Sequence, residues 1–127
     1  MKHWLIVTAL LALLAAPLTA LAAEATDFEV KTTADLLNLC TASPGDNLYA
    51  EAINFCQGYL VGAYHYYAAS TTGPNSKTEF CFPEPKPTRN EAIGMFVAWA
   101  KAHPEYHKEL PVETEFRFLH ETWPCKQ

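Results

Sequence analysis

Residues 49–67 read Tyr-Ala-Glu-Ala-Ile-Asn-Phe-Cys-Gln-Gly-Tyr-Leu-Val-Gly-Ala-Tyr-His-Tyr-Tyr. Their apolar positions recur every three or four residues, the period of a helix with one face turned toward a core. That face comprises Ala52, Ile53, Cys56, Tyr59, Leu60, Ala63 and Tyr67. The stretch therefore predicts one long amphipathic helix, against which the rest of the fold can pack.

Two glycines, Gly58 and Gly62, lie four residues apart within this predicted helix. A glycine inside a helix costs about 0.5–1 kcal/mol relative to alanine. We interpret the pair as a place where another helix approaches closely. The alternative is a weak point in the helix with no packing role.

Three further helices are predicted around the long one, and nothing in the chain has a strand-rich pattern. Thr32 and Asp35 have the spacing of a capping box and begin a short helix that ends near Cys40, and Thr88 and Glu91 begin another that ends near Ala102. Pro111 fits the first position of a last helix. The predicted core faces of the last two helices are Ile93, Phe96, Val97 and Ala100, and then Val112, Phe116, Leu119 and Trp123. The predicted fold is all-α, a compact bundle of about four helices stapled by two disulfides, with residues 24–31 loosely held.

The N-terminal segment has the pattern of an export signal. Lys2 precedes an apolar run over residues 4–16, Pro17 ends that run, and Ala20-Leu21-Ala22 fits a small-residue cleavage site. A membrane-spanning helix needs about 20 apolar residues, more than this run provides. We predict a signal peptide over residues 1–22, cleavage after Ala22, no stable membrane anchor, and a single helical domain over residues 23–127 in the periplasm.

The predicted mature domain is acidic. Eight basic and fourteen acidic residues follow Ala22, which gives a net charge of −6. An acidic surface repels phosphate backbones and anionic membranes, so it argues against nucleic-acid binding and mildly favours a basic protein partner.

Four cysteines, Cys40, Cys56, Cys81 and Cys125, follow the predicted cleavage site. An even number in a small exported domain indicates two disulfides. The absence of a C-x-x-C pair argues against a zinc site and against a thioredoxin-type redox site. Cys56 lies about two turns into its helix, whereas a tight turn after Cys40 would bring only the start of that helix close to Cys40. We therefore predict the pairs Cys56–Cys81 and Cys40–Cys125.

No residue pattern indicates catalysis, a cofactor or a metal. The chain has no nucleophile elbow, no H-E-x-x-H and no glycine-rich phosphate loop. His103 and His107 have the spacing of metal ligands, but Pro104 lies between them and no third ligand is near in sequence, which favours surface or turn histidines. Disulfide formation would also remove the thiols that a cysteine-based enzyme needs.

The aromatic cluster at the end of the long helix has two interpretations. Tyr67 continues the core face, whereas Tyr64, His65 and Tyr66 cannot all share it, because successive helical residues point in different directions. Exposed tyrosines are enriched at recognition surfaces, because each combines apolar area with a hydroxyl group. These three residues are candidate partner-binding residues, and the alternative is that they pack beneath the polar loop over residues 70–79.

The cysteines and their neighbours resemble a known family. Leu36-Leu37-Asn38-Leu39-Cys40, Cys56-Gln57-Gly58-Tyr59-Leu60-Val61-Gly62, Cys81-Phe82-Pro83, His103-Pro104-Glu105 and Trp123-Pro124-Cys125 occur in this order. Together they resemble the Rap/Tai family of type VI secretion immunity proteins, over Asp35–Cys125. These are small periplasmic helical proteins that protect a bacterium against a cell-wall amidase delivered by its kin.

The resemblance implies a protein that binds a secreted peptidoglycan amidase effector and blocks its active site, with no catalytic residue of its own. It also implies that homodimers can form. The cysteines, Gly58, Tyr59, Gly62, Trp123 and Pro124 carry over as scaffold residues. One departure is His65, which stands about where such proteins often have an acidic residue.

Three functional classes follow from the sequence. The first is the periplasmic immunity protein. The second is a general periplasmic helical binding or chaperone-like module without a dedicated effector. The third is a thiol-based enzyme, which needs a free reactive cysteine.

Overall fold

The computed structural model describes residues 22–126, and the predicted signal peptide lies almost wholly outside this range. Four α-helices and two short 3₁₀ helices follow in the order η1 (Ala25–Glu29), α1 (Thr33–Cys40), α2 (Tyr49–Ser70), α3 (Arg89–Ala102), η2 (Pro104–Tyr106) and α4 (Pro111–Thr122). Within the described range the only β-type pairing is an isolated antiparallel bridge between Phe80 and Pro124. The all-α prediction is confirmed.

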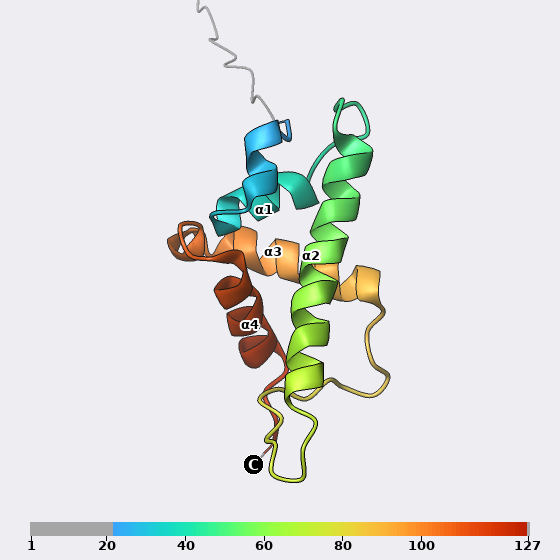
Figure 1. The fold of residues 1–127 in the computed structure, drawn as a ribbon, viewed down its shortest axis with the longest axis vertical. Helices are drawn as coiled ribbons and strands as arrows, with labels where there is room; N and C mark the ends of the chain where they lie inside the picture. The colour runs from blue at the N-terminus through green and yellow to red at the C-terminus, as the bar shows by residue number, and fades with distance from the viewer. Residues whose placement is uncertain (1–21, 127) are drawn as a thin grey trace, which may run out of the picture.

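The long helix α2 runs the length of the molecule, and α1, α3 and α4 pack against it (Figure 1). Helices η1 and α1 lie at its N-terminal end, α3 crosses it, and α4 lies on the same side as α1. One core joins all four α-helices, and its buried members include Leu36 and Leu39 of α1, Ala52, Cys56 and Leu60 of α2, Phe96 and Ala100 of α3, and Phe118 and Leu119 of α4. The periodicity of residues 49–67 thus predicted the helix that organises the core.

The predicted helix starts are confirmed in atomic detail. Thr32 and Thr88 each accept a hydrogen bond from the backbone N–H three residues ahead, and Asp35 and Glu91 each accept one from the corresponding N-cap N–H. Pro111 occupies the first turn of α4, as expected. These caps satisfy backbone N–H groups that α1 and α3 leave unpaired, so local sequence is enough to predict where these two helices begin.

The N-terminal segment is packed, which corrects the expectation of a loose stretch over residues 24–31. Asp27 is buried, and its carboxylate accepts hydrogen bonds from the Glu24 N–H at 2.8 Å and from Nδ2 of Asn38 at 3.1 Å. The Phe28 ring packs edge-on against Phe55 of α2, with the ring centroids 5.4 Å apart. A polar segment can be well ordered when its polar groups have partners in the fold.

The core face of α4 also differs from the prediction. Val112 is exposed, whereas Pro111, Thr114, Glu115, Phe118 and Leu119 are buried. The apolar residues alone suggested another face because two positions of the buried face are polar. One of them, Thr114, is satisfied by a buried hydroxyl–hydroxyl bond of 2.7 Å to Thr33 of α1.

The disulfides are Cys40–Cys56 and Cys81–Cys125, so the predicted pairing was wrong. The prediction assumed that residues 41–48 would place the first turn of α2 beside the end of α1, and they do not. The connection instead lets the second turn of α2 meet that end, with the Cα atoms of Cys40 and Cys56 5.1 Å apart. Cys81 is brought to Cys125 because its N–H donates to the Trp123 carbonyl at 2.7 Å, beside the Phe80–Pro124 bridge.

The interpretation of Gly58 and Gly62 as a close helix contact is also wrong. Both glycines are exposed on α2, and a methyl group built at either position would meet no atom within 4 Å. Neither glycine has positive φ. The structure therefore gives no packing reason for glycine at these two positions.

We expect Gly58→Ala and Gly62→Ala each to stabilise the domain by about 0.5–1 kcal/mol, because alanine loses less backbone entropy in a helix. Urea unfolding of each variant measures the change. Ala52→Gly, at a fully buried position of the same helix, serves as the contrast and should destabilise. A loss of stability in both Gly→Ala variants would show that another group does approach these positions.

Candidate partner-binding surface

The three candidate residues at the end of α2 have different surroundings. Tyr66 is 78% exposed, His65 is exposed, and Tyr64 is half-buried. Helical residues advance by about 100° each, so Tyr66 points away from Tyr64 around the helix. The structure therefore brings Tyr64 and His65 together on one side of α2 and places Tyr66 on another.

Tyr64 belongs to an aromatic cluster beneath the chain that returns after the loop. Its ring contacts those of Phe80 and Phe82, with centroids 6.3 and 5.7 Å away. The ammonium of Lys86 lies 4.3 Å from the Phe82 ring centroid and 3.3 Å from the Tyr64 hydroxyl. Tyr64 therefore packs against the rest of the fold, and its hydroxyl accepts a hydrogen bond from the Lys86 ammonium at the surface.

Tyr67 packs in the core, as the helix periodicity predicted. Its ring stacks on Phe80 at 5.0 Å and contacts Phe116 of α4 at 5.2 Å. Phe80 is itself buried, so this aromatic group forms the end of the core nearest the loop.

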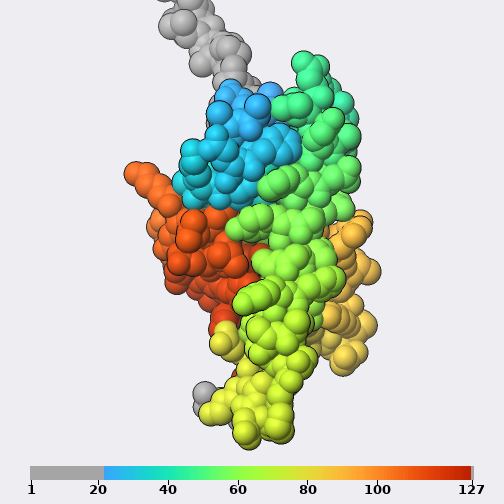
Figure 2. Space-filling model, in the orientation of Figure 1, coloured from blue at the N-terminus to red at the C-terminus, as the bar shows by residue number. Residues whose placement is uncertain are grey.

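The loop over residues 71–79 projects beyond the end of α2 and lies beside the C-terminal segment (Figures 1 and 2). Residues 72–79 are all exposed, and their sequence is Thr-Gly-Pro-Asn-Ser-Lys-Thr-Glu. A turn within it is closed by the Ser76 N–H donating to the Gly73 carbonyl at 3.0 Å. The loop therefore presents polar backbone and side chains to solvent at one end of the molecule.

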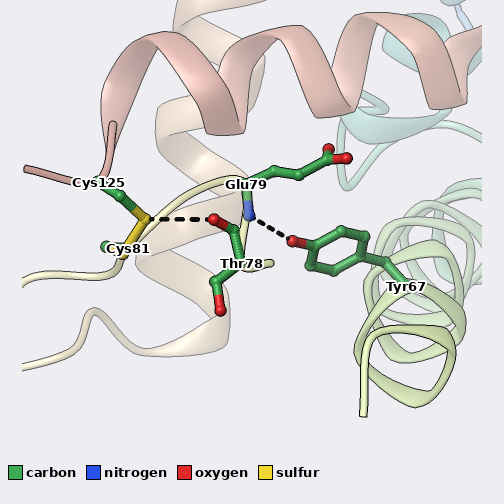
Figure 3. Close-up of a disulfide and its surroundings, with 5 residues drawn as sticks. All are labelled: Tyr67, Thr78, Glu79, Cys81 and Cys125. Atoms are coloured by element: carbon green, nitrogen blue, oxygen red, sulfur yellow. Dashed lines mark hydrogen bonds between the residues drawn. A yellow bond between two sulfur atoms is a disulfide. The ribbon is translucent and has the colours of Figure 1, made fainter. Parts of the chain in front are cut away.

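The loop starts at the end of α2, where the Thr71 N–H donates to the Tyr67 carbonyl at 3.0 Å, and its other end is held by contacts around Glu79 (Figure 3). The Glu79 N–H donates to the Tyr67 hydroxyl at 2.8 Å, and the Glu79 carboxylate lies 3.0 Å from Nε2 of His120 on α4. The Cys81–Cys125 disulfide follows directly, and the Cys125 sulfur lies 3.6 Å from the Thr78 carbonyl oxygen. Anchoring limits the conformations the loop explores, and a preorganised loop loses less entropy on binding.

A pocket of about 230 Å³ opens on the Tyr64 side of α2. Among its lining residues, Leu60, Phe96, Leu119 and Glu115 are buried, whereas His65, Lys86 and Arg89 are exposed. Oε2 of Glu115 is buried without a hydrogen-bond partner. Desolvation in these surroundings raises the pKa of the Glu115 carboxyl from 4.5 to about 8.

His103 and His107 make structural hydrogen bonds. Nδ1 of His103 lies 2.7 Å from the Trp99 carbonyl, and Nε2 of His107 lies 2.9 Å from the Ala100 carbonyl. The His103 ring stacks on Trp99 at 4.1 Å. The residues between 22 and 126 contain no group of three side chains that could hold a metal ion.

Of the predicted scaffold residues, Tyr59, Trp123 and Pro124 make contacts within the fold, whereas Gly58 and Gly62 are exposed on α2. Trp123 is buried against Phe82 and Phe118, and Pro124 forms the bridge with Phe80. Tyr59 is half-buried and stacks on Phe55. Because all four cysteines are paired, no thiol is available for a cysteine nucleophile.

Sequence reasoning missed Glu115, Lys86 and Arg89 as neighbours of one pocket. The sequence could have indicated only Glu115, a glutamate on the face of the last helix that proves to be buried. It was missed because the core face of that helix was predicted at other positions. Lys86 and Arg89 are separated from Glu115 by more than twenty residues of chain, and only the packing of α3 on α4 brings them together.

Comparisons with known proteins give one match. Residues 32–125 match the model of a family described as Rap1a immunity proteins. No curated protein and no solved structure matches the chain. Across the described residues, no helix is both long and apolar enough to span a bilayer.

Proposed function

The chain belongs to the family of Rap1a immunity proteins, and from this we propose that it binds and inhibits a type VI secretion cell-wall amidase in the periplasm. Membership implies an immunity role toward a type VI effector, and the match over residues 32–125 is the observation that carries the proposal. The export pattern of residues 1–22 and two disulfides support a periplasmic location, because disulfides persist in oxidising compartments. In this role the protein acts by binding and has no catalysis of its own.

The end of the molecule formed by the anchored loop over residues 71–79 and exposed Tyr66 is the contact surface we favour. An inhibitor of a cell-wall hydrolase has to cover or fill a cleft built for a substrate. A projecting polar loop held at both ends suits that task, since little of it must be ordered on binding. Tyr66 adds a large side chain with both apolar area and a hydroxyl.

The direct test uses purified protein over residues 23–127 and the type VI amidases of the same organism. We expect one amidase to bind with 1:1 stoichiometry and to lose peptidoglycan hydrolysis in proportion to the inhibitor added. Tight binding that leaves hydrolysis unchanged would contradict inhibition. Weak capture of many unrelated envelope proteins would instead favour the general binding or chaperone-like module.

Tyr66→Ala is expected to weaken amidase binding by roughly 2 kcal/mol, the range of an aromatic hot spot, while leaving stability almost unchanged. Calorimetric titration measures the affinity, and urea unfolding measures the stability. Leu110→Ala is the matched control, because Leu110 is also an exposed apolar side chain but lies before α4, outside this surface. Equal affinity of the Tyr66 variant and the parent would remove Tyr66 from the interface.

A further inference from the structure

The pocket between α2, α3, α4 and the chain leading into α3 has the size of a small-molecule site. Its volume is about 230 Å³, whereas a cavity of roughly 150 Å³ already binds benzene. The residues around it are mostly apolar and include Leu60, Phe96 and Leu119. An apolar body larger than one benzene ring is therefore the best match for its interior.

The pocket contains one deep polar group that the fold does not satisfy. Glu115 is 5% exposed, and its Oε2 has no hydrogen-bond partner. Buried polar atoms nearly always have a partner, so each exception calls for a physical reason. Glu115 lines the pocket, so a ligand that carries a hydrogen-bonding group at its inner end would give this carboxyl a partner that the fold does not provide.

The outer part of the pocket is cationic although the chain as a whole is acidic. Lys86 and Arg89 are both exposed residues that line it, and neither forms an ion pair with another described residue. The Lys86 ammonium is already positioned by Tyr64 and Phe82, 4.3 Å from the Phe82 ring centroid. Two unpaired cations beside an apolar interior favour an anionic group at the opening.

We propose that this pocket binds a small organic anion with an apolar body, a carboxylate that pairs with Lys86 and Arg89, and a hydrogen-bonding group that reaches Glu115. The inference does not rest on the immunity role. A protein that fails to inhibit an amidase could still bind such a ligand, and the reverse also holds.

Three probes test the three features of the ligand separately. 6-Hydroxy-2-naphthoate carries the carboxylate, the bicyclic body and the distal hydroxyl. 2-Naphthoate lacks the hydroxyl, and 2-naphthol lacks the carboxylate. Titration of the mature domain, followed by NMR shifts and calorimetry, should show saturable 1:1 binding of the first probe below about 1 mM, with shifts centred on Leu60, Phe96 and Leu119.

Variants assign each contact. Lys86→Gln combined with Arg89→Gln should weaken both naphthoates at least about tenfold, whereas Lys101→Gln, an exposed lysine at the other end of α3, should leave them unchanged. Glu115→Leu should abolish the preference for the hydroxylated naphthoate over 2-naphthoate. Glu115→Gln should retain much of that preference, and it serves if the leucine variant does not fold.

Several results would overturn the proposal. These are no saturable binding of either naphthoate, shifts confined to residues outside the pocket, and equal affinity of the parent and the Lys86/Arg89 double variant. Binding of 2-naphthol as tight as that of the naphthoates would show an apolar cavity without anion recognition, and would likewise reject it.

Discussion

Glu115→Gln is expected to stabilise the protein at pH 8 by several kcal/mol and to have little effect near pH 4.5. The Glu115 carboxyl is buried, its Oε2 lacks a hydrogen-bond partner, and its pKa is raised from 4.5 to about 8 by desolvation. Glutamine has nearly the same shape and stays neutral at every pH. The variant therefore avoids the cost of keeping an ionisable carboxyl in the core.

The pH window follows from linkage. Near pH 4 the carboxyl is largely protonated in both the folded and the unfolded chain, so Glu115 contributes no pH-dependent penalty. Between pH 4.5 and about 8 the unfolded chain ionises and the folded chain does not, so the native state binds more protons and its stability falls as pH rises. Above pH 8 the penalty reaches its full value, on the order of 3–5 kcal/mol.

Urea unfolding of the parent and Glu115→Gln at pH 5, 7 and 8.5 tests this prediction. The difference in unfolding free energy should grow with pH across the series. Glu121→Gln on the same helix is the control, since Glu121 is exposed and a surface change should stay within about 0.5 kcal/mol. A glutamine variant that is less stable than the parent at pH 8.5 would mean that Glu115 is paired and ionised in the native state.

Removing the Cys81–Cys125 disulfide by a double change to serine is expected to cost about 4 kcal/mol. The bond closes a span of 44 residues, and in the chain-entropy model longer closed spans restrict the unfolded chain more strongly. The Cys40–Cys56 bond spans 16 residues and should be worth about 3 kcal/mol by the same reasoning. Either loss is a large share of a small domain's stability.

Urea unfolding of the two double-serine variants shows which disulfide contributes more to the free energy of unfolding. The Cys81–Cys125 variant should also free one end of the loop over residues 71–79 and weaken amidase binding, whereas the Cys40–Cys56 variant should bind normally while folded. Mass mapping of the parent should recover the peptides joined as Cys40–Cys56 and Cys81–Cys125. Recovery of Cys56–Cys81 would contradict both disulfides and the way α1 and the C-terminal segment pack around α2.

Local sequence was enough to predict most of the helical framework. The two threonine capping boxes, the start of α4 at Pro111 and the course of α2 depend on contacts within a few residues, so they can be inferred without knowing the fold. The family resemblance rested on the order of five short motifs, and the match over residues 32–125 confirms it.

Features that depend on long-range packing could not be predicted in the same way. The disulfide pairing required the path of residues 41–48, and the buried face of α4 required knowing that Thr114 bonds to Thr33 across the bundle. For the candidate surface, we predicted Tyr64, His65 and Tyr66 as one group, because the sequence alone does not show that Tyr64 packs against Phe80 and Phe82 while Tyr66 stays exposed. The pocket near Glu115 is lined by α2, the chain over residues 82–87, α3 and α4, so its one local signal, a glutamate on the last helix, could not be interpreted without the fold.

Protection of living cells is the decisive measurement for the immunity function. A type VI amidase exported to the periplasm should lyse its host, and survival can be measured with the complete chain, with a chain beginning at Ala23, or with neither. The complete chain is expected to restore growth, and the chain lacking residues 1–22 is expected to fail because it does not reach the amidase. Continued lysis with each type VI amidase of the organism, despite folded complete chain in the periplasm, would contradict the immunity function.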